Sequence, residues 1–173
     1  MGINMFENMT LFSETQKFRQ YWLIVILLTP SAITFYGAYQ QLVLGIPFGN
    51  NPSSDNMVAL FAVVFGFLFP ALIFSMNLKT EVRYDGLYLR FFPFHLSFKR
   101  LEFDDIASYR IITYNALRDY GGWGIRYGKK GKAYNVSGNS GIMLEFKNGK
   151  NLMIGSHDPH GFLDAMNKAT RTA

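Results

Sequence analysis

The sequence predicts a membrane α-helical hairpin followed by one small, mainly-β domain of about seven antiparallel strands, closed by one C-terminal helix. Two long segments, Gln20–Ser54 and Asn56–Leu78, contain no Asp, Glu, Lys or Arg. From Lys79 onward, short β-type segments alternate with turn signals. Only 17% of the 173 residues are charged and none is cysteine, whereas a soluble domain usually has about 25% charged residues. This composition excludes a simple soluble globule, a disordered chain and a disulfide scaffold.

Residues 1–20 are expected to form an N-terminal interfacial segment. Met5, Met9 and Phe12 share one face of a helix over residues 3–20, which predicts an amphipathic helix on the membrane surface. Two other interpretations stay open. The segment could extend the first span, or it could dock on the C-terminal domain.

Two transmembrane helices are predicted at 21–44 and 57–78, joined by an extracytoplasmic loop at 45–56. As helices, both are longer than the ~30 Å hydrocarbon core of a bilayer. The connecting loop is rich in Gly, Pro, Asn and Ser, which is typical of a tight surface turn. Uninterrupted apolar runs of this length favour membrane spans over buried core helices.

The distribution of Lys and Arg predicts that both termini are cytoplasmic. Lys17 and Arg19 precede the first span, Lys79 and Arg83 follow the second, and the loop between the spans has no Lys or Arg. The positive-inside rule therefore predicts a multi-pass protein of a prokaryotic inner (plasma) membrane. The first apolar run starts too late and is too long for a cleaved signal peptide.

Neither span has an ionisable residue at membrane depth, so the hairpin is expected to be an anchor rather than a transport path. Ala62 and Gly66 form a small-xxx-small pair in the second span. Such a pair lets another helix approach closely. It serves either packing inside the hairpin or self-association.

Residues 79–173 form one cytoplasmic domain of β-type segments. Asp85-Gly86 and Asn148-Gly149 are typical two-residue hairpin turns. Asp158 as N-cap and Pro159 at the first helical position predict one terminal helix. The expected strands are Thr80–Tyr84, Leu87–Phe92, Ser97–Phe103, Ile106–Tyr114, Lys132–Ser137, Gly141–Phe146 and Asn151–Gly155, with a Gly-rich segment at Gly121–Gly131.

Several short motifs carry a resemblance to a known family. They are Gly122-Trp123-Gly124-Ile125-Arg126, Tyr134-Asn135-Val136-Ser137-Gly138, and Ile154-Gly155-Ser156 before Asp158-Pro159. With the strand order and the two preceding spans, the chain resembles bacterial PH-like domains of small membrane proteins. The resemblance implies a PH-like fold and an adaptor or binding role, and it supplies no reaction.

The residues that could carry chemistry have simpler structural explanations. His157 and His160 flank Asp158 at the predicted helix start. The sequence has no Cys and only one other His, His95, so it lacks the Cys and His ligands to complete a structural zinc site there. Asp104 and Asp105 are typical of a solvated turn, and every Gly-Lys pair fails the phosphate-loop pattern. We therefore expect no catalytic residue, no cofactor and no metal, and the chain is predicted not to be an enzyme.

Four basic residues, Arg126, Lys129, Lys130 and Lys132, cluster in the Gly-rich segment. A cytoplasmic leaflet is anionic, and each Lys or Arg near it contributes about 1 kcal/mol. The cluster either contacts lipid headgroups or is a solvated loop. Nucleic acid is not an expected partner, because the domain is tethered to a membrane and its excess of Lys and Arg over Asp and Glu is small for a nucleic-acid-binding domain.

Together these observations predict a membrane-anchored PH-like binding or scaffold protein that acts through a protein partner or as a homo-oligomer. One alternative is a surface sensor of anionic membrane lipid that uses the basic cluster. Another is an accessory subunit of a larger membrane complex.

Overall fold

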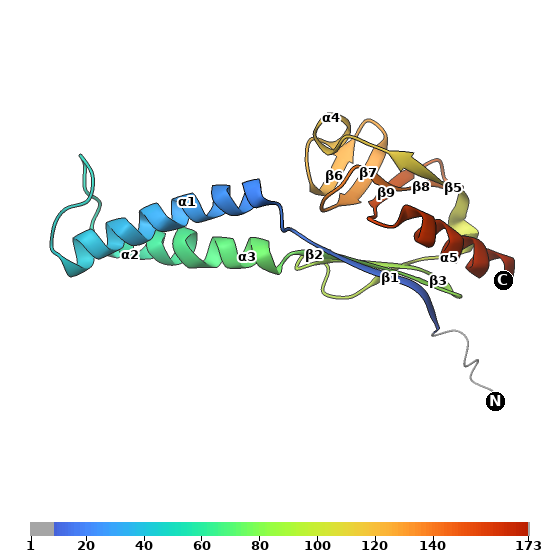
Figure 1. The fold of residues 1–173 in the computed structure, drawn as a ribbon, viewed down its shortest axis with the longest axis horizontal. Helices are drawn as coiled ribbons and strands as arrows, with labels where there is room; N and C mark the ends of the chain where they lie inside the picture. Colours follow the sequence, from blue (N-terminus) through green and yellow to red (C-terminus); the bar gives the residue numbers. More distant parts are fainter. Residues whose placement is uncertain (1–8, 173) are drawn as a thin grey trace. The chain divides into compact units, whose positions relative to one another are not determined.

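The computed structural model describes residues 9–172, which form two compact units (Figure 1). One unit is Phe18–Met76. The other combines the N-terminal segment, up to Lys17, with everything from Asn77 onward. The helical unit is therefore inserted into the chain of the β unit.

The helical unit contains two helices that are long and apolar enough to cross a membrane, Tyr21–Val43 and Asp55–Ser75. Each helix includes a π-helical stretch. Along the chain the elements are α1 (Tyr21–Ala38), η1 (Tyr39–Val43), α2 (Asp55–Phe61), η2 (Ala62–Leu68) and α3 (Phe69–Ser75).

Small residues let these two helices pack closely. Ala62 is buried, and a Cβ atom added to Gly66 would lie 3.0 Å from the Phe35 ring. The Ser31 hydroxyl donates a hydrogen bond to the Phe65 carbonyl across the pair, at 3.1 Å. Ala62 and Gly66 thus face the partner helix of their own hairpin.

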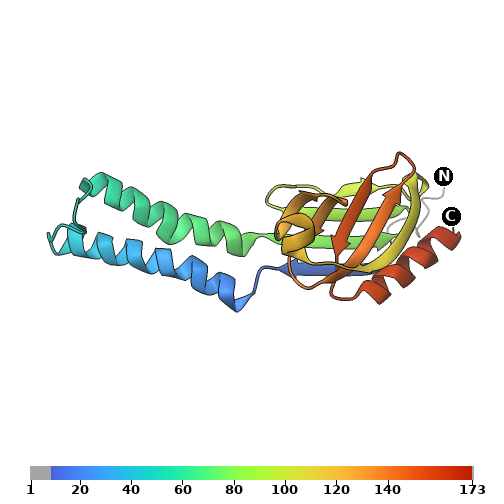
Figure 2. The same cartoon turned by 90° about the horizontal axis from the view of Figure 1, so that it is seen from above.

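The β unit has two sheets with the strand orders β1-β2-β3-β4 and β5-β8-β9-β7-β6 (Figure 2). Together with the C-terminal helix α5 they are compatible with a β-sandwich. The first sheet contains β1 (Thr10–Lys17), β2 (Asn77–Arg83), β3 (Gly86–Phe92) and β4 (Lys99–Leu101). The second contains β5 (Ile106–Thr113), β6 (Gly124–Gly128), β7 (Gly131–Asn135), β8 (Ser140–Phe146) and β9 (Asn151–Gly155). The helical elements of this unit are η3 (Phe103–Asp105), α4 (Ala116–Tyr120) and α5 (Pro159–Thr172).

The expectation of about seven antiparallel strands needs correction in two respects. Residues 9–172 contain nine strands, because the Gly-rich segment forms one further strand, β6, and the N-terminal segment forms another, β1. The β7–β9 pair is parallel, with Lys132 opposite Leu152. The β8–β9 hairpin turns the chain back, so β9 runs in the same direction as β7.

The N-terminal segment is a β-strand where it is described, so the predicted amphipathic helix is wrong for Thr10–Lys17. β1 pairs antiparallel with β2, with Lys17 opposite Asn77. The Phe12 ring stacks on Phe162 of α5 at 5.2 Å. The open alternative of docking on the C-terminal domain is the one observed, and Met5 lies outside the described residues.

The core of the β unit lies between the sheets and under α5. The predicted helix start is confirmed, since the Gly161 amide donates to the Asp158 carboxylate at 2.9 Å. Fully buried apolar side chains include Leu78, Val82, Leu87, Phe91, Ile142, Leu144, Ile154, Phe162 and Met166. Because Leu78 belongs to this core, the second apolar helix ends at Ser75, three residues before the expected boundary.

Candidate functional site

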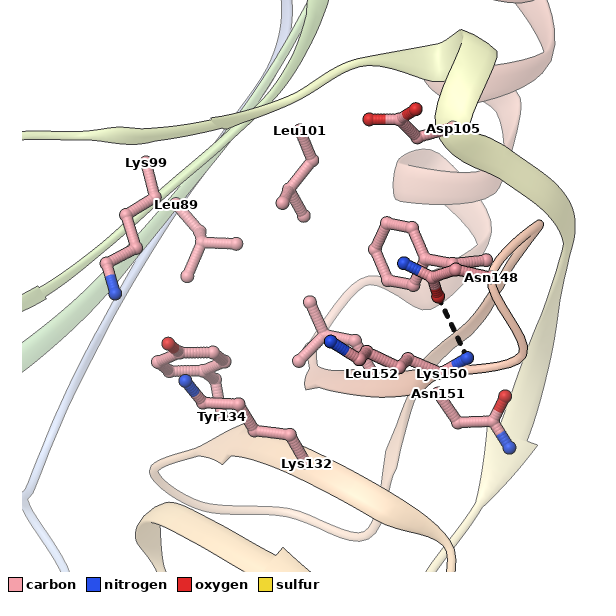
Figure 3. Close-up of a pocket in the computed structure, with 11 residues that line it drawn as sticks. Leu89, Lys99, Leu101, Asp105, Lys132, Tyr134, Asn148, Lys150, Asn151 and Leu152 are labelled. Carbon is pink, nitrogen blue, oxygen red and sulfur yellow. Dashed lines mark hydrogen bonds between the residues drawn. The ribbon is translucent and has the colours of Figure 1, made fainter.

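Helix α5 covers one side of the β unit, where it contacts β1, β2, β5 and β8. On another side, a cavity of about 370 Å³ lies between β3 and β4 of one sheet and β7 and β9 of the other (Figure 3). Its lining residues are Leu89, Lys99, Leu101, Asp105, Lys132, Tyr134, Phe146, Asn148, Lys150, Asn151 and Leu152.

Three lysines from three separate elements line this cavity, which we call the lysine pocket. Lys99 begins β4, Lys132 lies in β7, and Lys150 directly precedes β9. Figure 3 shows the three lysine side chains coming from different segments around the space that these residues line. Asp105 is the carboxylate among the lining residues, so positive charge is in excess.

The Lys132 ammonium is held in place by two aromatic rings. Its nitrogen lies 4.8 Å from the centroid of the Tyr134 ring and 5.3 Å from that of Tyr127. Burial alone lowers the pKa of Lys132, but its interactions with Tyr134 and Tyr127 outweigh burial and raise the pKa. The group therefore stays charged at neutral pH.

The floor of the lysine pocket is apolar. Leu89 and Leu101 come from one sheet and Leu152 from the other. The Asn148 side chain orders the turn at the rim, because its oxygen accepts a hydrogen bond from the Lys150 amide at 3.0 Å. An apolar floor under several ammonium groups suits an anionic group attached to an apolar body.

A second hollow, of about 610 Å³, adjoins the lysine pocket and shares Lys132 and Lys150 with it. Lys129 and Lys130 line this hollow. The Lys130 nitrogen is 3.8 Å from the Asp119 carboxylate. A hydrogen bond from the Asn115 backbone lowers the pKa of that carboxyl, and the nearby Lys130 charge adds to this effect against desolvation.

The structure divides the predicted cluster of Arg126, Lys129, Lys130 and Lys132. In the β6–β7 ladder Arg126 lies opposite Ala133, whereas Lys132 lies opposite Tyr127. Successive residues of a strand point to opposite faces, so Arg126 is on the face away from Lys132. Its Nε donates to the Trp123 carbonyl at 2.8 Å.

Lys99 and Lys150 are pocket residues that sequence reasoning missed. Each lies far along the chain from the Gly-rich segment, and each looks like an ordinary exposed lysine in its local sequence. The parallel β7–β9 pair brings Lys150 to the side of Lys132, and the facing sheet, which contains β4, brings Lys99 to the same cavity. No short-range pattern carries this signal.

A second polar cluster joins β1 to the loop before α5. The Glu14 carboxylate accepts hydrogen bonds from the Ser156 hydroxyl at 2.6 Å and from the His157 amide at 2.8 Å. The His157 Nε2 lies 2.6 Å from the Ser137 hydroxyl, and its Nδ1 lies 3.6 Å from Glu14. This Glu14 cluster has the residue types of an acyl-transfer triad, but 3.6 Å exceeds a hydrogen bond. Because Glu14 is already bonded to the loop, we interpret the cluster as a clamp on β1.

The other residues tested for chemistry do not come together in one site, although Asp105 also lines the lysine pocket. Asp104 and Asp105 are exposed in the short 3₁₀ turn η3, and His160 is exposed on α5. Among residues 9–172, no group of three His, Cys, Asp or Glu side chains is placed to hold a metal ion.

Comparison with known proteins supplies a family. Residues 3–172 match a family of unknown function, DUF6141, and the chain belongs to that family. No curated protein and no solved structure gives a significant match.

Proposed function

We propose that the chain is a membrane-anchored binding protein: its hairpin spans the inner membrane, and its β unit binds an anionic group on the cytoplasmic side. The lysine pocket carries this proposal. Three lysines from three elements line one cavity together with the apolar residues Leu89, Leu101 and Leu152. Three lysines against one lining carboxylate, Asp105, leave an excess of positive charge around the cavity, which suits an anionic ligand.

Exposure of the apolar helices supports the membrane anchor. In each helix only 17% of the most apolar stretch is buried. Val25 and Phe67 are both 64% exposed. A core helix of a soluble protein would bury such side chains, whereas lipid would cover them here.

The pairing of β1 with β2 supports a two-span topology. Lys17 and Asn77 are opposite each other in one ladder, so both ends of the helical unit lie on the same side of any membrane. The segment between them therefore crosses zero or two times, and two suitable helices favour two crossings. Lys17, Arg19 and Lys79 assign both ends to the cytoplasm by the positive-inside rule.

A PH-like classification of the β unit is part of the proposal. Two sheets with a C-terminal helix packed on strands of both sheets support it. The additional strand β1 and the parallel β7–β9 pair would be departures from the expected pattern. A binding role does not depend on this classification, because it rests on the lysine pocket.

Self-association through the second span receives less support. Ala62 and Gly66 already pack inside the hairpin, so an oligomer would need another surface. If a stoichiometric protein partner co-purified in mild detergent, the chain would instead be an accessory subunit.

The test is a thermal-shift titration of the full chain in zwitterionic detergent. Inorganic phosphate and micelles doped with phosphatidylglycerol are added separately, since a ligand that binds the folded state raises Tm. We expect at least one of them to raise Tm, and the pair of results tells a soluble anion from a lipid headgroup. The variant Lys99→Gln/Lys132→Gln/Lys150→Gln should lose the rise.

A matched control replaces three exposed cations outside the lysine pocket: Lys147→Gln/Arg118→Gln/Arg171→Gln. This control should keep the rise. An equal rise in the pocket variant would refute anion binding in the lysine pocket.

A further inference from the structure

The loop between β3 and β4, residues 93–98, exposes two large apolar side chains. Phe94 is 65% exposed and Leu96 is 79% exposed. Phe98 of the same loop is half-buried, because the Lys79 and Arg90 cations lie 5.5 and 5.1 Å from its ring centroid. The exposed pair is therefore a specific feature of the loop tip.

His95 holds the loop in this shape. Its amide donates to the Phe91 carbonyl at 2.8 Å, and its ring lies 5.6 Å from the ring of Tyr134. Burial lowers the pKa of His95, and the positive charges of Lys99 and Lys132 lower it further. The His95 ring is thus neutral at pH 7, and the loop tip carries no charge.

The loop starts at the end of the first sheet where β1 leads into the helical unit and β2 leads out of it. Phe92 lies opposite Asn77, and Asn77 lies opposite Lys17. Helix α3 ends at Ser75, so only one residue separates it from the start of β2 at this end of the sheet. Cα steps of 3.8 Å and a cross-strand distance of ~5 Å keep the Phe94 Cα within roughly 20 Å of the end of α3.

We infer that the β3–β4 loop inserts Phe94 and Leu96 into the interface of the bilayer that holds the hairpin. This inference rests on the proposed membrane anchor. The bilayer is the occupant because the loop begins within a few residues of an apolar helix end, and exposed aromatic and aliphatic side chains prefer the interface to water.

Insertion of this loop would bring the lysine pocket close to the lipids that could supply its anionic ligand. Lys99 follows the loop directly, and Tyr134, which lines the pocket, contacts His95. A loop embedded at headgroup depth places this end of the pocket among lipid headgroups. The anion is then the headgroup of an anionic lipid rather than a soluble phosphate.

The chain has no cysteine, so single labels can be introduced directly. The full chain with Leu96→Cys carries an environment-sensitive fluorophore in nanodiscs that contain doxyl-labelled lipid. Val25→Cys reports on the hairpin, and Asp104→Cys reports on the opposite end of the first sheet. We expect blue-shifted, lipid-quenched emission from the labels at positions 25 and 96, and neither effect at position 104.

The outcomes separate the two proposals. Quenching at position 25 with none at position 96 overturns the loop insertion and leaves the anchor standing. No quenching at position 25 overturns the anchor itself.

A second variant tests the loop without a label. Phe94→Ser/Leu96→Ser should lose most of the Tm rise caused by phosphatidylglycerol. Leu117→Ser, at a 62% exposed apolar residue of α4, should keep it. An unchanged rise in the double variant also counts against the inference.

Discussion

Replacing Glu14 with alanine is expected to loosen β1 from the β unit. The carboxylate is only 13% exposed and accepts two hydrogen bonds from the loop before α5, at 2.6 and 2.8 Å. Ser156, one of the two donors, is 2% exposed. Removing the acceptor leaves both donors without their partner.

The size of the effect follows from these bonds. A hydrogen bond to a charged group contributes about 1.5–3 kcal/mol. The Ser156 hydroxyl can rotate toward another acceptor, and the exposed His157 ring, 3.6 Å from the carboxylate, adds little. We therefore expect a loss of about 3 kcal/mol of unfolding free energy, a large part of the ~5–15 kcal/mol of a typical domain.

The assay is guanidinium unfolding of the full chain in detergent, in a Trp22→Phe background. The remaining Trp123 then reports on the β unit alone. Glu102→Ala is the matched control, because this exposed carboxylate has no ion pair among the described contacts, and it should change stability by less than ~0.5 kcal/mol. A Glu14→Ala effect as small as that of the control would refute the clamp.

Three further predictions concern pairing, packing and pH. Oxidation should link Thr15→Cys to Lys79→Cys, which are opposite each other in the β1–β2 ladder, while Thr15→Cys with Arg83→Cys, ~13 Å further along, should stay unlinked by mass spectrometry. Gly66→Leu should clash with Phe35 and destabilise the helix pair by about 1–3 kcal/mol. The hairpin loop should then be cleaved faster by protease, while the mass of the detergent-solubilised protein stays the same. Burial raises the pKa of Glu81, but hydrogen bonds and charge interactions with Lys79 and Arg83 outweigh it and hold that pKa below 4.5. The stabilisation by Glu81 is therefore complete above pH 4.5 and is lost as pH falls through the lowered pKa. In the Glu81→Gln variant, the denaturation midpoint should depend less on pH in that range.

The sequence predicts those features that depend on neighbours along the chain. Long uncharged runs mark the two helices because length and hydropathy are local properties. Asn148-Gly149 marks the β8–β9 turn because Gly149 adopts φ +78°, which glycine tolerates best. At the first hairpin the turn falls one residue earlier than expected, with Arg83 opposite Gly86.

The sequence does not predict features that depend on distant partners. The local sequence does not predict β1, because its partner strand begins only after the whole helical unit. The position of Phe12 also fits one face of a helix as well as one face of a strand. Arg126 and Lys132 look like one cluster by proximity, but strand alternation separates them. Lys99 joins Lys132 only through the packing of two sheets, which no single-sequence period encodes.

Anchoring changes what affinity the lysine pocket needs. Each lysine near an anionic surface contributes about 1 kcal/mol, so three contribute ~3 kcal/mol, or roughly 150-fold in binding. That is weak for a soluble ligand. A hairpin that holds the pocket at the membrane makes lipid binding effectively intramolecular, at local concentrations in the millimolar range or above. Weak binding then suffices for occupancy, so phosphatidylglycerol should raise Tm far more than inorganic phosphate at equal bulk concentration. The same rise with both would argue that the pocket takes its anion from solution.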